Sequence, residues 1–140
     1  MPDAISPSDA AVAAAASALR AQQSRMRVIA ENMANADSVS KTAGGDPYRR
    51  QVAVFAPVQL ANGAQGVAMT RVASDQSAFR TEYQPGHPAA DSKGYVKLPN
   101  VDPLTEAMDM RDAQRAYEAN LNVIETANAM QQSLIGLLQK

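Results

Sequence analysis

The chain has 140 residues, with 13 lysines and arginines against 14 aspartates and glutamates, for a formal net charge of −1. This length predicts one domain, and the balanced charge gives no general attraction to nucleic acid or to an anionic membrane. The absence of cysteine and the single histidine, His87, exclude disulfides, thiolate metal sites and multi-histidine metal sites. Aromatic residues make up only 4%, so a large self-sufficient core is not expected.

The apolar segments are too short or too weak for a membrane span, which needs about 18 strongly apolar residues. The alanine-rich run 10–18 follows Asp3 and Asp9 and no basic residue, whereas a secretory signal begins with a basic region. We therefore expect an amphipathic helix there and no cleaved signal peptide.

A long helix is predicted from Ser6 to Asn35. It opens with serine, proline and an acid, which favour a helix start. Its apolar side chains recur every seven residues: Val12, Leu19, Met26 and Met33. This spacing predicts a coiled-coil-like seam, which Gln22 and Gln23 interrupt.

A second long helix is predicted from Asp102 to about Leu138, again with an acidic cap before a proline. Its heptad positions are Met110, Tyr117, Ile124, Gln131 and Leu138. The seam contains amides at Asn120, Asn128 and Gln131, and such polar groups fix register at the expense of stability.

The middle of the chain has a different composition, with six of the seven glycines and five of the eight prolines. A loop is predicted first, with turns at Asn62-Gly63 and at 85–88. Four β-branched or aromatic runs are predicted to be strands. They are Tyr48–Val58, Val67–Ala73, Phe79–Tyr83 and Gly94–Leu98.

The predicted fold is mainly α with a small β insert. Residues 1–36 form the N-terminal helix of a core domain, and residues 37–101 form a loop and a β-hairpin-rich insert. Residues 102–140 form the C-terminal helix of the same core domain. The two long helices are predicted to form a coiled-coil-like antiparallel pair.

Neither helix buries its narrow apolar stripe alone. Two interpretations stand side by side at this point. The helices are either completed by neighbouring subunits or packed as an ordinary two-helix hairpin on their own insert.

Two other features point to ordinary structural roles. His87 lies in a Pro-Gly-His-Pro turn without a second histidine, which favours a turn residue over a catalytic or metal-binding one. Arg49 and Arg50 mark either a solvated strand edge or a salt bridge to the acidic C-terminal helix of a neighbour. The candidate partners there are Asp112, Glu118 and Glu125.

The segment Ile29-Ala-Glu-Asn-Met-Ala-Asn-Ala-Asp37 resembles the N-terminal signature of the bacterial flagellar axial family of rod and hook proteins. Four further segments are similar to ones that occur in this order in a short rod protein of that family. They are Gly44–Gln51, Pro85–Pro88, Gly94–Asp102 and Met108–Asn122. The resemblance covers essentially the whole chain.

This resemblance implies a non-enzymatic structural subunit of the proximal rod in the periplasm, which polymerises through its terminal helices to transmit torque. It implies export by the flagellar type III apparatus without a cleaved signal peptide, and no cofactor or metal. The implied partners are other copies of the chain, the export apparatus and other rod subunits of the FlgB, FlgF, FlgG and FliE kinds. Nucleic acid, small-molecule substrates and membrane insertion are not expected.

We expect the subunit interface to use both seams, the signature segment and the start of the first strand. The residues are Val12, Leu19, Met26, Ile29, Asn32, Met33, Asn35, Tyr48, Arg49, Arg50, Met110, Tyr117, Asn120, Leu121, Ile124 and Leu134. The alternative function is a helical adaptor or chaperone of the flagellar export system. An adaptor predicts a stable folded dimer with ordered termini in dilute solution.

Overall fold

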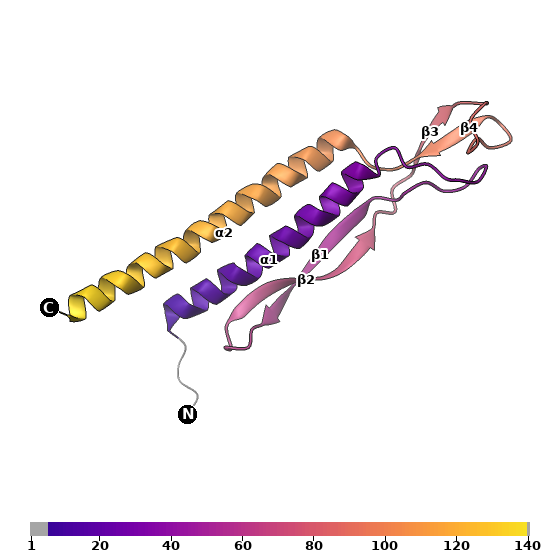
Figure 1. Ribbon diagram of the computed structural model, residues 1–140. Coiled ribbons are helices and arrows are strands. Elements are labelled where there is room, and N and C mark those ends of the chain that lie inside the picture. Colours follow the sequence, from indigo (N-terminus) through magenta and orange to yellow (C-terminus); the bar gives the residue numbers. More distant parts are fainter. Residues whose placement is uncertain (1–5, 140) are drawn as a thin grey trace. The chain divides into compact units, whose positions relative to one another are not determined.

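A computed structural model describes residues 6–139, and within them it contains two long helices and two two-stranded sheets (Figure 1). The elements in chain order are α1 (Pro7–Ala34), β1 (Gln51–Gln59), β2 (Gln65–Ser74), β3 (Arg80–Tyr83), β4 (Tyr95–Leu98) and α2 (Pro103–Leu138). The two helices pack together, and β1 with β2 and β3 with β4 form antiparallel hairpins. The predicted fold class is therefore confirmed.

Both helices begin where side-chain caps were predicted. The Asp9 N–H donates to the Ser6 hydroxyl (3.2 Å) at the start of α1. At the start of α2, Asp102 accepts the Leu104 N–H (3.2 Å) and the Thr105 hydroxyl (2.6 Å). These bonds, the Thr105 bond first, hold the pKa of Asp102 below its usual value. A charged cap satisfies N–H groups that have no partner inside the helix.

The contacts divide the chain into two compact units, and each unit draws on both helices and on the hairpin of β1 and β2. Among the described residues, unit 1 contains 6–26, 54–71 and 112–139, and unit 2 contains 27–53 and 72–111.

Unit 1 has a core of small side chains. Its buried apolar residues are Ala15, Ala21, Ala113 and Ala127. Buried Ser17 joins α1 to β2, because its hydroxyl accepts the Val67 N–H (3.0 Å) and donates to the Ala14 carbonyl (2.7 Å). Gln131 of α2 donates to Ser8 (3.1 Å) and to Asp9 (2.9 Å), so the end of α2 is fixed against the start of α1.

Unit 2 has branched apolar side chains in its core, which are Val28, Ile29, Val96 and Val101. In its hairpin, β3 and β4 pair with Tyr83 opposite Tyr95, and the two rings meet edge to face at 5.2 Å. In the turn before β4, His87 accepts the Ala89 N–H at 3.0 Å, which is the turn role predicted for it.

The structure moves the start of the first strand. It begins at Gln51, three residues after the predicted start at Tyr48. The Tyr48 N–H donates to the Ser38 carbonyl (3.0 Å) and the Arg50 N–H to the Asn100 side chain (2.7 Å). Because these backbone donors are already engaged, residues 48–50 do not join the ladder. The described helices include none long and apolar enough to cross a membrane.

Gly94 closes the turn before β4 with a φ of +82°, and an added Cβ would lie 2.9 Å from Tyr83 and 3.0 Å from Pro85. Gly94→Ala should therefore lower the free energy of unfolding by about 1–3 kcal/mol. Gly86→Ala is the matched control, since an added Cβ there meets nothing within 4 Å. Urea unfolding followed by circular dichroism measures both, and equal losses would contradict the strain assigned to Gly94.

Candidate functional site

Asn32, in the last turn of α1, is the centre of a buried polar network in unit 2, with 1% of its surface exposed. Its amide nitrogen donates to the Gln51 carbonyl (2.8 Å) and to the Glu106 carboxylate (3.1 Å). Its oxygen accepts the Tyr48 hydroxyl (2.9 Å) and the Gln51 N–H (2.9 Å). All four hydrogen-bonding positions of the amide are thus used. Asn32 joins the end of α1, the start of β1 and the first turn of α2.

Glu106 places a carboxylate at a fully buried position in the first turn of α2. Besides Asn32, it is bound by the Nε of Arg50. The same guanidinium reaches Asp109 (3.0 Å) and Asp75 (3.4 Å). Burial alone would lower the pKa of Arg50, but the hydrogen bond and charge of Glu106 outweigh it and raise that pKa. Breaking a buried pair by removing one partner typically costs about 3–5 kcal/mol.

The phenol of Tyr48 is a permanent donor to this network. Burial first, and then the negative charges of Glu31 and Glu106, raise the pKa of Tyr48 above its usual value. The hydroxyl therefore keeps its proton at neutral pH and continues to donate to Asn32.

The loop after β2 is held by a second set of bonds. Arg49 donates to the carbonyls of Asp75 (2.9 Å) and Ser77 (3.1 Å), and its guanidinium lies 4.1 Å above the Phe79 ring. Asn100 donates to the same two carbonyls at 3.0 and 3.2 Å. The polar groups around Asn32 bind one another. Together with the bonds in this loop, they fix the backbone positions of four segments: the end of α1, the start of β1, the loop after β2 and the first turn of α2.

The structure brings three of the predicted interface residues together, namely Asn32, Tyr48 and Arg50. The others lie apart from this network. Ile29 is buried and Asn35 binds the Glu31 carbonyl and the Ser38 hydroxyl. The half-buried ones are Val12, Leu19, Met26, Arg49, Met110, Tyr117, Asn120 and Ile124, and the exposed ones are Met33, Leu121 and Leu134.

Arg50 has acidic partners within its own chain. One of the two interpretations of Arg49 and Arg50 named Asp112, Glu118 and Glu125 of a neighbour as candidate partners, and that contact stays a prediction. Within the chain Arg50 pairs with the three carboxylates described above. Glu106 and Asp109 lie three residues apart, next to the helix cap, and so occupy one side of α2. That spacing is the signal from which a cationic partner was predictable. Gln51 takes part through its backbone, for which the sequence holds no signal.

A second feature is the apolar surface at the end of α2. Four large side chains in its last two turns are exposed: Leu134 by 60%, Ile135 by 55%, Leu137 by 72% and Leu138 by 87%. Scattered exposed apolar residues are normal, but a contiguous group marks an interaction surface.

Asn32→Asp should lower the free energy of unfolding by about 3 kcal/mol. The substitution places a carboxylate oxygen where an N–H now donates to Glu106 and to the Gln51 carbonyl. Asn35→Asp is the matched control, because it removes only an exposed bond to the Glu31 carbonyl (2.8 Å) and should cost less than about 1 kcal/mol. Urea unfolding compares the two variants. Equal losses would mean that Asn32 is not the centre of the network.

Unit 2 should lose stability in acid. Three aspartates have pKa values held below their usual value by hydrogen bonds, chiefly Asp75 by Ser77, Asp91 by Tyr95 and Asp102 by Thr105. A carboxyl with a lowered folded pKa stabilises the fold fully above its unfolded value, here 3.8, and this contribution is lost as the pH falls through the folded pKa. The urea concentration at the unfolding midpoint should therefore decrease as the pH falls below about 4. Asp75→Asn should make that decrease shallower. If the variant loses stability in acid as steeply as the natural chain does, Asp75 does not contribute to this pH dependence.

Comparison with known proteins gives the family. The family model described as "Flagellar basal body rod FlgEFG protein C-terminal" matches residues 92–137. The chain is 43% identical over 134 residues to the flagellar basal-body rod protein FlgC of Agrobacterium fabrum (strain C58), covering 95% of this chain and 96% of that protein. It is 46% identical over 118 residues to FlgC of Escherichia coli O157:H7, covering 83% and 87%. It is 37% identical over 131 residues to FlgC of Bacillus subtilis (strain 168), covering 82% and 87%. The chain therefore belongs to the FlgC family of flagellar basal-body rod proteins.

Proposed function

We propose that the chain is a non-enzymatic structural subunit of the flagellar proximal rod, which polymerises through its terminal helices and transmits torque across the periplasm. Family membership supports the rod assignment. The main support for polymerisation is the exposed apolar end of α2. Its four large side chains are exposed in the single chain, and contact with a partner would bury them.

The composition of unit 1 supports the same conclusion. Alanine contributes little apolar area, and burial stabilises by about 25 cal/mol per Å². The contacts between α1 and α2 in this unit therefore contribute little, while four large side chains of α2 stay in solvent. Neighbouring subunits would supply the missing burial.

The proposed partners are other copies of the chain and other rod subunits, of the FlgB, FlgF, FlgG and FliE kinds. Delivery is proposed to go through the flagellar export apparatus without a cleaved signal peptide. We also propose that residues 1–36 and 102–140 act as one core domain from which the insert 37–101 projects. The predicted interface positions on both helices belong to this proposal.

The alternative is a helical adaptor or chaperone of the export system, and one observation favours it. The network around Asn32 is complete within one chain, as a protein that folds before it meets a partner requires. Circular dichroism with amide hydrogen exchange on the purified chain separates the two functions. Fast exchange over 6–26 and 112–139 supports the rod subunit, whereas protected helices in a stable dimer support the adaptor.

Leu134→Asp should abolish rod assembly and swimming while export of the chain continues, because it places a charge in a surface that neighbours must bury. Gln132→Asp, exposed on the same helix two residues earlier, is the control and should swim normally. The half-buried seam variants Leu19→Asp and Ile124→Asp should give the same defect as Leu134→Asp. Swimming in soft agar, with the chain measured in the basal-body fraction and in the medium, tests this. Normal swimming of all three variants would refute assembly through the terminal helices.

A further inference from the structure

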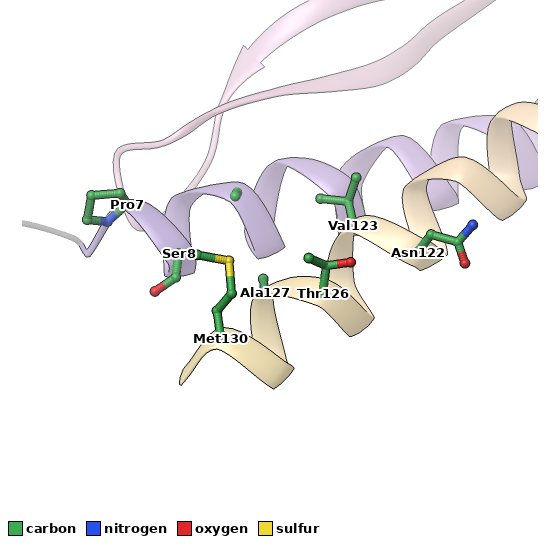
Figure 2. A pocket seen from close by; sticks show the side chains of 8 residues that line it. Pro7, Ser8, Asn122, Val123, Thr126, Ala127 and Met130 are labelled. Atoms are coloured by element: carbon green, nitrogen blue, oxygen red, sulfur yellow. The ribbon is translucent and has the colours of Figure 1, made fainter. Parts of the chain in front are cut away.

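Surfaces that are open to a partner differ in how closely they specify it. In unit 1 an apolar groove lies between the start of α1 and the end of α2, where Pro7, Val123 and Met130 line it (Figure 2). None of its eight lining residues is charged, so the groove does not distinguish one apolar partner from another. The outer edge of β3 in unit 2 is more specific, because it offers backbone groups and charges in a fixed order.

The pairing of β3 with β4 leaves the backbone of Tyr83 without a bond to β4. The Gln84 N–H donates to the Gly94 carbonyl (2.9 Å), and the register places these two residues opposite each other. Hydrogen-bonded and non-hydrogen-bonded pairs alternate along an antiparallel ladder, so the next pair, Tyr83 and Tyr95, is not hydrogen-bonded. Accordingly, the Tyr95 N–H and carbonyl both bind Asp91, each at 2.9 Å. The Tyr83 N–H and carbonyl therefore point away from β4.

Thr81 lies two residues before Tyr83, so its backbone groups point the same way. Within residues 6–139, no hydrogen bond from outside the β3–β4 ladder reaches the backbone of either residue. All four residues of β3 are exposed. We call the backbone groups of Thr81 and Tyr83 the β3 edge. An open edge of this kind pairs with another extended chain.

The charged side chains of β3 select the chain that fits this edge. Arg80 and Glu82 flank Thr81 on its two sides. When two β3 edges pair in antiparallel fashion about Thr81, Arg80 of each copy lies opposite Glu82 of the other. The two neighbouring registers that keep the same backbone groups facing place Glu82 opposite Glu82, or Arg80 opposite Arg80. Opposite charges in such positions stabilise a sheet and like charges destabilise it, so the register about Thr81 is favoured.

The same register matches the remaining side chains. Phe79, which directly precedes β3, comes opposite Tyr83 of the other copy, and the two Thr81 residues face each other. Aromatic pairs and threonine pairs both stabilise neighbouring strands. The order of residues 79–83 is therefore self-complementary at every position.

Both charges of β3 are available to a partner. Within residues 6–139, Arg80 and Glu82 take part in no ion pair. Arg80 donates to the Val101 carbonyl at 3.5 Å, which is a long and weak hydrogen bond.

We propose that two copies of the chain pair in antiparallel fashion through their β3 edges, with Thr81 on the twofold axis. The far side of β4 is occupied within its own chain, since Asp91 binds the Tyr95 backbone and Asp46 binds the Lys97 amine (3.0 Å). The sheet therefore ends at four strands. Such an isologous contact closes on itself, whereas an open array needs heterologous contacts, so the pair is a state of the free chain. It covers an edge that otherwise invites aggregation.

Charge reversal tests the register, with the Kd of the purified full-length chain measured by sedimentation velocity. Arg80→Glu and Glu82→Arg should each raise the Kd by at least about tenfold, or about 1.4 kcal/mol, since each places like charges opposite each other twice. The double variant restores opposite charges and should return the Kd to within about threefold of the natural value. Arg111→Glu is the matched control, exposed on α2 of the same unit, and should leave the Kd unchanged.

Cysteine cross-linking tests the position of the axis, because the chain contains no cysteine of its own. In the proposed pair the two Thr81 Cα atoms lie about 5.5 Å apart, a distance that a disulfide spans. Thr81→Cys should therefore give a disulfide-linked dimer on oxidation. Thr70→Cys, exposed on β2, is the control and should stay largely monomeric.

Several outcomes would overturn this pairing. They are a chain that stays monomeric at every concentration, a dimer that both single charge reversals leave intact, and equal cross-linking at Thr81→Cys and Thr70→Cys. Amide hydrogen exchange separates this dimer from the one that an adaptor predicts. Protection of the Thr81 and Tyr83 amides that rises with chain concentration supports the pairing, whereas a rise confined to the helices contradicts it.

Discussion

The buried carboxylate of Glu106 constrains the whole of unit 2. A charge without solvent contact is tolerated only when it is paired and hydrogen-bonded. Arg50 supplies the charge and Asn32 the second bond. Because these two residues come from a loop and from the end of α1, neutralising one side chain fixes the positions of three segments. Asn32 also holds both backbone groups of Gln51, so the register of β1 depends on the same amide.

The two units use different means of cohesion. Unit 2 combines branched apolar side chains with polar groups that bind each other inside the chain. Unit 1 has an alanine core, a few bonds from Ser17 and Gln131, and large apolar side chains left in solvent. Stability is not uniform in proteins, and segments with few buried apolar contacts open most readily. By this criterion unit 1 should open more readily than unit 2, and in the proposed assembly neighbouring subunits would supply the burial that it lacks.

The sequence predicts the features that depend on interactions between nearby residues, but not those that depend on residues far apart in the chain. The helix ends were predicted within one residue, because caps and prolines act locally at Ser6 and Asp102. The start of the first strand was missed by three residues, because Asn100, fifty positions away, binds the Arg50 N–H. The pairing of Arg50 with Glu106 was missed for the same reason. Periodicity predicts the apolar side of a helix, but it does not reveal which distant polar groups meet.

The amides in the helix seams illustrate how register is set where packing alone is weak. Gln131 fixes the end of α2 against the cap of α1, whereas Asn120 folds back onto the Ala116 carbonyl of its own helix (2.7 Å). Among the described residues, the buried Gln22 oxygen is left without a hydrogen-bond partner. An unsatisfied buried acceptor costs about 1–3 kcal/mol. This cost falls on a unit whose alanine core contributes little apolar burial, so the unsatisfied Gln22 oxygen lowers the stability of unit 1 itself.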